Sequence, residues 1–217
     1  MGNESLSKSE GISLKETIAV YRQRLYDISW LMASLSEPIA RQANKEDGCT
    51  GRFWEGRFKS QALLDDAAVL SCMAYVDLNP IRAKIAKTPE TSDHTSIQKR
   101  TEAIQQHKCQ PYKLLPFVGN PRQDMPQGIA FSLKDYCELV DTTGRIIRAD
   151  KVGANDAAHS PLLCRLGLSE EQWITLTTEF GQHFCYAAGA EQMMIEIKSH
   201  THRKRIGGMR QAKRLLS

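Results

Sequence analysis

The most restrictive feature of the sequence is an apolar helix that a proline stops. Residues 67–78 read AAVLSCMAYVDL and are followed by Asn79 and Pro80. Proline disfavours helical backbone at the residue before it and has no N–H group for the helical ladder. Asp65 or Asp66 can cap the other end, because aspartate accepts hydrogen bonds from the free amides of a first turn. We therefore predict a helix that starts there, ends or bends at Asn79, and buries Val69, Leu70, Met73, Val76 and Leu78.

Tyr75 and Asn79 lie four residues apart in this helix. Both side chains are expected on one face, about 6 Å from each other. A tyrosine can act as a covalent nucleophile, and an amide oxygen can bind a hard divalent cation such as magnesium or manganese. A cation beside a tyrosine would polarise a phosphate group for attack. In the plainer interpretation, the tyrosine only packs and the Asn-Pro pair only ends the helix.

A short strand is predicted just before the tyrosine helix, at residues 57–63. Its side chains alternate between two faces, and one face carries Arg57, Lys59 and Gln61. Alternation over this length is typical of a strand, and this face would be basic and polar.

The N-terminal part of the chain predicts two helices. SLKE at residues 13–16 is a capping box, so a helix is expected to start at Ser13. Ser36 is expected to start a second, short helix with Pro38 in its first turn, where the missing N–H costs nothing. The first helix would be about 22 residues long and one-sided, because its apolar residues recur at steps of three and four. These residues are Leu14, Ile18, Tyr21, Leu25, Ile28, Met32 and Leu35.

The second half of the chain predicts a linker followed by helices. Residues 111–128 hold four of the eight prolines and two of the fourteen glycines, which is typical of a linker. Residues 129–217 are mostly helical in pattern. The last twenty residues, 198–217, contain seven lysines or arginines and no acidic residue. Such a tail suits a nucleic-acid backbone and equally suits a solvated terminus.

Composition excludes some classes of protein. The chain has 217 residues, of which 41% are hydrophobic, enough for one large or two small domains. No window approaches the roughly 18 uninterrupted apolar residues of a membrane span, and the first residues do not resemble a signal peptide. We therefore expect a cytoplasmic protein with no membrane partner. The six cysteines lack a C-x-x-C pair, so we expect reduced thiols in the core rather than disulfides or a zinc site.

The run RFWEGRFKSQALLDDAAVLSCMAYVDLNPIRA, residues 52–83, resembles the conserved block of the REP-associated tyrosine transposases. These belong to the HUH single-tyrosine transposases of bacterial insertion sequences, and the likeness covers roughly residues 14–100. The resemblance implies that Tyr75 attacks a DNA phosphodiester, forms a 5′-phosphotyrosine link and leaves a free 3′-hydroxyl. It also implies that Asn79 completes a site for Mg²⁺ or Mn²⁺.

The same resemblance implies contacts with DNA, as single strands or hairpin repeat ends. Arg52, Trp54 and Arg57 precede the tyrosine helix and would contact phosphates or stack on bases. Lys59 and Arg82 are further candidates, although Arg82 also fits a solvated side chain and Trp54 a packing anchor. Intact relatives often work as dimers, so a homodimer is a possible partner.

The chain departs from the family at the metal site. Family members carry a His-hydrophobic-His motif on a central strand, and nothing upstream of Ser13 supplies it. The His200-Thr201-His202 sequence stands at the other end and is interpreted as surface histidines. A lone Asn79 amide does not hold a divalent cation. We therefore expect an N-terminally truncated transposase that binds no metal alone and is inactive alone.

These observations predict an α+β, predominantly helical fold. It would contain a truncated remnant of an antiparallel HUH-type sheet with packed helices, followed by a helical C-terminal region. The expected organisation is a polar tail at 1–12, the C-terminal half of a catalytic domain at 13–110, a linker at 111–128, and a helical extension with a basic tail at 129–217.

The expected function is DNA transposition, by metal-dependent single-strand cleavage and rejoining through a phosphotyrosine intermediate. The alternative is a non-catalytic DNA-binding or regulatory remnant. A third possibility is an unselected fragment with no biochemical role.

Overall fold

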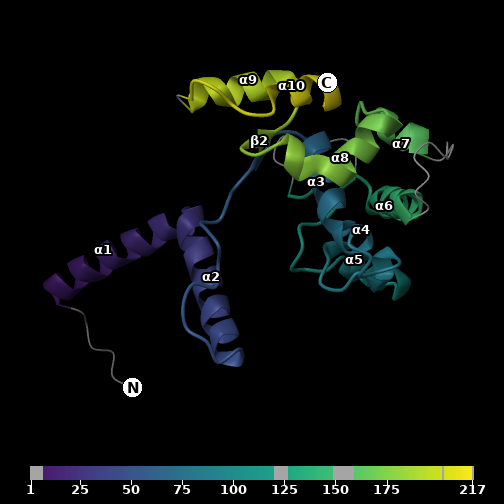
Figure 1. The fold of residues 1–217 in the computed structure, drawn as a ribbon. Helices are drawn as coiled ribbons and strands as arrows, with labels where there is room; N and C mark the ends of the chain where they lie inside the picture. The colour runs from purple at the N-terminus through teal and green to yellow at the C-terminus, as the bar shows by residue number, and fades with distance from the viewer. Residues whose placement is uncertain (1–6, 120–126, 149–158, 202, 217) are drawn as a thin grey trace. The chain divides into compact units, whose positions relative to one another are not determined.

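The computed structural model describes residues 7–119, 127–148, 159–201 and 203–216. The chain divides into two compact units, Met1–Lys59 and Ser60–Ser217, which we call the N-terminal and C-terminal units. The fold is predominantly helical, with a single two-stranded sheet in the part of the chain that the structure describes (Figure 1). None of the described helices is long and apolar enough to span a membrane.

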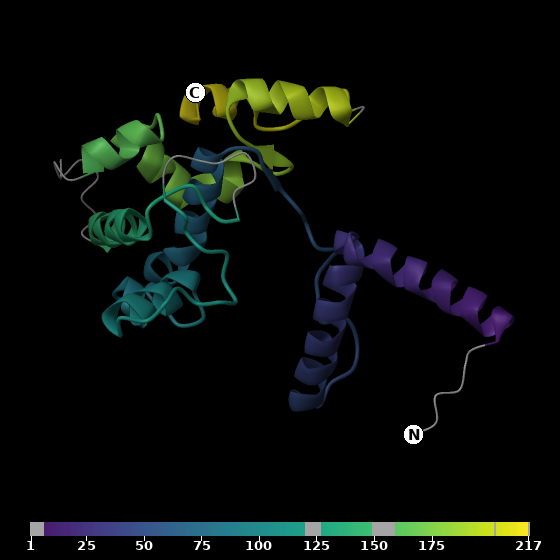
Figure 2. The ribbon, with the colours of Figure 1, turned by 180° about the vertical axis from the view of Figure 1, so that it is seen from behind.

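The N-terminal unit contains two helices that meet at a corner. Helix α1 (Lys8–Leu25) follows Ser7, whose hydroxyl accepts from the Glu10 amide while the Glu10 carboxylate accepts from the Ser7 amide. Helix α2 (Ile28–Glu46) follows Asp27, whose carboxylate accepts from the Ser29 amide at 2.8 Å. Both views show the two helices diverging from this corner (Figures 1 and 2).

The predicted helix boundaries in this unit are wrong. The capping box at residues 7–10, SKSE, starts α1 upstream of Ser13, so part of the predicted polar tail is helical. The expected single helix is interrupted at Asp27, because this residue caps a new first turn. No helix starts at Ser36, and Pro38 lies inside α2.

The C-terminal unit is built around two long helices from distant parts of the sequence. Helix α3 (Asp66–Asp77) packs along α8 (Glu170–His183), and both views show them crossing at the centre of the unit. The remaining elements are α4 (Asn79–Arg82), the 3-10 helix η1 (Pro89–Thr91), α5 (Ser96–Gln105), α6 (Leu133–Arg148), α7 (His159–Arg165), α9 (Glu191–His200) and α10 (Met209–Leu215).

The described sheet is parallel. Strand β1 (Ala62–Leu63) pairs with β2 (Ala187–Ala188), with Ala62 opposite Ala187. The Ala62 amide donates to the carbonyl of Tyr186 at 3.0 Å. The predicted strand at 57–63 is therefore wrong except for its last two residues. The expected antiparallel HUH-type remnant has no support among the described residues, since their one sheet runs parallel.

The core lies in the C-terminal unit. Its largest fully buried side chains include Trp173, Tyr136 and Phe180. Leu70 and Leu78 are buried as predicted, whereas Val76 is 55% exposed. Val76 lies outside the buried face of α3, which is formed mostly by small and polar residues. This face consists of Ala68, Leu70, Ser71, Ala74 and Asp77.

Two further sequence predictions, on the linker and on the cysteines, can be compared with the structure. Phe117, inside the range predicted as a linker, is buried against the ring of Tyr136 with the ring centroids 5.0 Å apart. The six cysteines are free thiols, and only Cys72 and Cys137 pack against the core. Cys72 and Cys137 are half-buried, and the exposed ones are Cys49, Cys109, Cys164 and Cys185.

Candidate functional site

The tyrosine helix begins at an aspartate that holds two parts of the chain together. Asp65 caps α3, as predicted, by accepting from the amide of Ala68 at 2.8 Å. Its second carboxylate oxygen accepts from the amide of Ala190 at 2.6 Å. Gly189 permits this approach, because a Cβ there would lie 2.8 Å from Leu64 Cβ and 2.9 Å from the Asp65 carboxylate. The cap therefore fixes the start of α3 against the end of β2.

The other end of the helix forms an elbow at the Asn-Pro pair. Helix α3 ends at Asp77, Leu78 is its C-cap, and Asn79 starts the short helix α4 with Pro80 in its first turn. This is the bend that the proline predicts. The elbow brings together three predicted site residues, Tyr75, Asn79 and Arg82, which we call the tyrosine elbow.

Arg82 organises the tyrosine elbow. Its guanidinium lies 3.9 Å from the centroid of the Tyr75 ring, within the range of a cation–π contact. One terminal nitrogen donates to the backbone carbonyls of Thr177 and Thr178, at 3.1 and 2.6 Å. The other donates to the Tyr75 carbonyl at 3.2 Å and to Asn79 Oδ1 at 3.0 Å. The Arg82 donors are thus occupied within the C-terminal unit, and the side chain is not simply solvated.

The Tyr75 ring packs against neighbouring side chains, whereas its hydroxyl has no hydrogen-bond partner among the described residues. The ring is half-buried and packs near Phe180, with the centroids 6.2 Å apart. A Cβ on Gly181 would lie 3.3 Å from the hydroxyl, so glycine leaves room beside it. The hydroxyl forms no hydrogen bond with another described residue and is not among the fully buried polar atoms without a partner.

A buried carboxylate lies beside the elbow, and the sequence predictions missed it. Asp77 is 1% exposed and accepts from the amides of Ser96 and Ile97, both at 3.1 Å. The Tyr136 hydroxyl donates to it at 2.7 Å. Asp77 therefore caps α5 from a distant helix. A signal was present in the sequence, because Asp77 is the one acidic residue in the apolar run AAVLSCMAYVDL.

Burial shifts the ionisation of this cluster. Burial raises the pKa of Asp77, and the hydrogen bonds from Tyr136, Ile97 and Ser96 oppose that rise. Burial also raises the pKa of Tyr136 well above its ordinary value and lowers the pKa of Arg100. Cys137, which follows Tyr136, has its pKa raised by burial to about 11. The donors around Asp77 and its cap position mark this cluster as structural.

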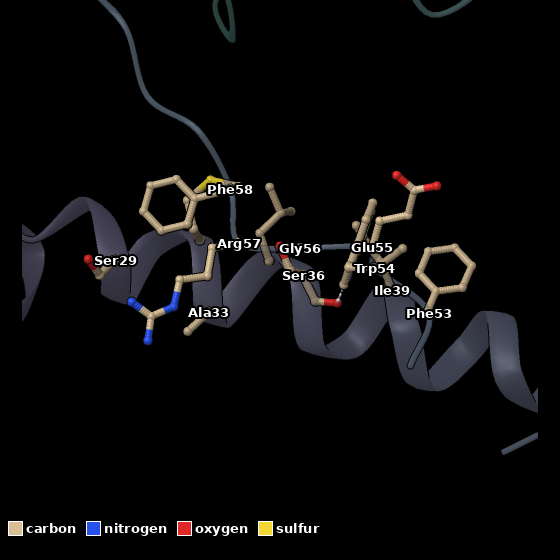
Figure 3. A pocket seen from close by; sticks show the side chains of 12 residues that line it. Ser29, Ala33, Ser36, Ile39, Phe53, Trp54, Glu55, Gly56, Arg57 and Phe58 are labelled. Atoms are coloured by element: carbon tan, nitrogen blue, oxygen red, sulfur yellow. Dashed lines mark hydrogen bonds between the residues drawn. The ribbon is translucent and has the colours of Figure 1, made fainter. Parts of the chain in front are cut away.

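The N-terminal unit carries an apolar groove along α2. Residues 53–58 lie over the helix and enclose a groove of about 940 Å³ (Figure 3). Figure 3 shows Arg57 and Phe58 toward one end and Phe53 toward the other. Trp54 lies between them, and its indole N–H donates to the Ser36 carbonyl at 3.0 Å. Trp54 thus anchors the segment to α2.

The remaining predicted DNA-binding residues belong to the same unit as this groove. Arg52, Arg57 and Lys59 are exposed, and none forms an ion pair with another residue that the structure describes. Phe53 and Trp54 make an edge-to-face pair with centroids 4.8 Å apart. Exposed cations beside aromatic rings are typical of surfaces that bind single-stranded nucleic acid.

The basic tail forms part of the C-terminal unit. Lys198 ends α9 with His200, and α10 follows a loop that carries three consecutive cations. Its seven cations are all exposed. They are Lys198, Arg203, Lys204, Arg205, Arg210, Lys213 and Arg214. His202 lies outside the described residues.

The residues present do not fit a divalent metal. Among the residues that the structure describes, no group of three or more His, Cys, Asp or Glu side chains is arranged to hold one. Asn79 Oδ1, the oxygen expected to bind the metal, accepts from Arg82 instead. A guanidinium beside this oxygen opposes a second cation there.

The structure thus brings Tyr75, Asn79 and Arg82 together, and it places Arg52, Trp54, Arg57 and Lys59 in the N-terminal unit. No family model matches the sequence, and no curated protein or solved structure is significantly similar to it. The transposase resemblance therefore stays a prediction based on residues 52–83.

Proposed function

We propose that this chain is a transposase-type DNA-binding protein, and that Tyr75 is the nucleophile of its single-strand cleavage and rejoining chemistry. The observation that carries the proposal is the tyrosine elbow. In it, the Asn-Pro bend lies one turn from a tyrosine whose ring is held by Arg82 and whose hydroxyl forms no hydrogen bond with another described residue. The described residues do not complete a cleavage site, so binding DNA is the activity expected of the chain alone.

The chemistry proposed for Tyr75 is a transesterification. The phenol oxygen would form a bond to a DNA phosphorus while the bond from that phosphorus to the 3′ oxygen breaks. The phenol proton would pass to the departing oxygen, leaving a 3′-hydroxyl and a 5′-phosphotyrosine. The reverse reaction would rejoin the strand. A tyrosine whose ring is already packed loses little freedom in reaching the attacking position.

DNA contact is supported by exposed cations in both units. Arg57 lines the aromatic groove, and Arg52 and Lys59 stand at the two ends of the segment 53–58 that borders it, where phosphates and bases could be bound together. The basic tail adds cations that suit phosphate contacts independent of sequence. Single-stranded DNA or the loop of a hairpin offers the exposed bases that such a groove requires.

A second candidate function is non-catalytic DNA binding. It is favoured by one contact, the hydrogen bond from Arg82 to Asn79 Oδ1, which uses the expected metal-binding oxygen. In this case the elbow would only fix α3 to α8, through the carbonyls of Thr177 and Thr178. The two candidates share the DNA surface and differ in the role of Tyr75.

The proposal is tested by fluorescence anisotropy with a DNA hairpin that carries a single-stranded loop and a 3′ label. We expect the affinity to fall steeply with salt, because each phosphate contact releases counterions. The triple variant R52A/R57A/K59A should lower the slope of log K against log salt by about 2 to 3. Replacing Lys84, Lys87 and Lys108 by alanine, exposed lysines of the C-terminal unit, should leave the slope nearly unchanged. No salt-dependent binding would overturn the proposal.

An adduct with the same labelled hairpin would favour the catalytic candidate, whereas binding alone is expected of both candidates. A covalent adduct on a denaturing gel in the presence of Mn²⁺, absent from Tyr75→Phe, would establish Tyr75 as the nucleophile. Binding without an adduct is the result expected for the chain alone. An adduct that persists in Tyr75→Phe would exclude Tyr75 as the attacking residue.

A further inference from the structure

A loop of the C-terminal unit, residues 110–117, is closed at its base by one side chain. The Gln110 amide pairs with both polar groups of the Phe117 backbone. Its nitrogen donates to the Phe117 carbonyl and its oxygen accepts from the Phe117 amide, both at 2.8 Å. Phe117 is itself buried against the ring of Tyr136. The two ends of the loop are therefore joined to each other and fixed to the core.

Two further segments hold the second half of this loop. Arg100, which is 2% exposed, donates to the Leu115 carbonyl at 2.9 Å. The Ile129 amide donates to the Pro116 carbonyl at 2.8 Å. Gly128 permits this close approach, because a Cβ there would lie 2.3 Å from the Pro116 carbonyl oxygen. These contacts leave the backbone of the loop little freedom.

The tip of the loop is a tight turn that displays a tyrosine. The Leu114 amide donates to the Pro111 carbonyl at 3.0 Å, so Tyr112 and Lys113 are the two central residues of a β-turn. Tyr112 is 90% exposed, and its ring centroid lies 5.7 Å from Lys113 Nζ. A large aromatic ring is thus held in solvent on a backbone that is fixed before any ligand binds.

The sequence around Tyr112 is basic. Residues 103–119 contain two lysines and one histidine and no acidic residue. Lys113 forms no ion pair with another residue that the structure describes. An exposed ring beside such an ammonium suits a nucleotide, because the ring can stack on a base while the ammonium contacts a phosphate.

We propose that Tyr112 is a base-stacking site for single-stranded DNA, with Lys113 beside it for the adjoining phosphate. The inference rests on the proposed DNA binding and adds a contact that lies wholly within the C-terminal unit. The pinned loop favours this role, because a side chain on an ordered backbone loses less entropy when a base stacks on it. Every base has a flat face for stacking, so the site should accept any sequence.

The experiment measures binding of the full chain to two labelled hairpins by fluorescence anisotropy. One hairpin has a loop of thymidines, and the other has an abasic loop of the same length. Tyr112→Ala should lower the affinity for the thymidine loop roughly tenfold and leave that for the abasic loop unchanged, because only a base can stack. Tyr112→Phe keeps the ring and should bind as wild type. Tyr26→Ala, the matched control, removes a tyrosine that is 93% exposed outside the loop and should also bind as wild type.

Circular dichroism checks that the variants are folded. Three outcomes would overturn the inference. The first is equal affinity of wild type and Tyr112→Ala for the thymidine loop, which would leave the proposed DNA binding intact. The second is an equal loss on both hairpins, which would show that Tyr112 does not act through a base. The third is a wild-type chain that binds neither hairpin, which would overturn the proposed function as well.

Discussion

Helices of both units begin at the same kind of capping signal, but only the C-terminal unit has a buried core. Helices begin at capping boxes in both, at Ser7 in the N-terminal unit and at Ser169 in the C-terminal unit. Only the second unit buries large side chains, with Trp173 fully enclosed, while Trp30 of the first is 45% exposed. Caps and periodicity therefore define helices, but tertiary packing supplies most of their stability.

The largest expected effect compares two tryptophans. Trp173→Ala should lower the free energy of unfolding by about 3–5 kcal/mol, because it empties the centre of the core. It also removes the hydrogen bond from the indole to Thr143. Trp30→Ala should cost less than about 1 kcal/mol. Urea denaturation followed by circular dichroism measures both, and equal losses would show that the two units share one core.

The next effect compares two aspartates. Asp77→Ala should cost about 3 kcal/mol, because the amides of Ser96 and Ile97 lose their acceptor in a buried site. Asp47→Ala, at the exposed end of α2, should change stability by less than about 0.5 kcal/mol. The same denaturation experiment applies. A loss below about 1 kcal/mol for Asp77→Ala would mean that water replaces the carboxylate.

A smaller effect concerns the tyrosine elbow. Arg82→Lys should cost about 1–2 kcal/mol, because an ammonium cannot reproduce the planar set of contacts to Asn79, Tyr75 and the α8 carbonyls. Arg210→Lys, on the exposed tail, is the matched control and should be neutral. Thermal unfolding of both variants measures the difference. Equal midpoints would remove Arg82 from the interactions that hold the elbow.

The last effect depends on pH. The pKa of Cys137 is raised from 9.0 to about 11 by burial, so its ionisation opposes folding. The stability it contributes is present below pH 9 and is lost as the pH rises through about 11. Between these values, wild type should lose up to about 2 kcal/mol relative to Cys137→Ala. Cys109→Ala, which replaces an exposed thiol, is the control, and parallel losses in all three proteins would contradict the assignment.

Local signals in the sequence predicted the elbow well. Asp65 caps α3 and Pro80 ends it, because both effects act within one turn of the residue that causes them. The break at Asp27 was missed, since the apolar spacing runs on through it. The spacing of apolar residues alone does not separate one long helix from two consecutive helices that keep the same spacing.

Contacts between distant residues were not predictable from one sequence. The parallel pairing of Ala62 with Ala187 joins segments 125 residues apart, and two-residue strands leave almost no pattern. The contacts of Arg82 with Thr177 and Thr178 are equally remote, so a residue that looked solvated became the centre of the candidate site. Asp77 was missed for the same reason, because its partners Ser96 and Tyr136 come from other helices.

The most direct test of the contrast between the units is hydrogen exchange, measured by mass spectrometry on the full chain. We expect peptides from α3, α6 and α8 to be protected, because they surround the buried core. Peptides covering residues 14–39 should exchange much faster, because none of their side chains is buried. Protection of residues 14–39 as strong as that of α3 and α8 would contradict the claim that the N-terminal unit has no core of its own.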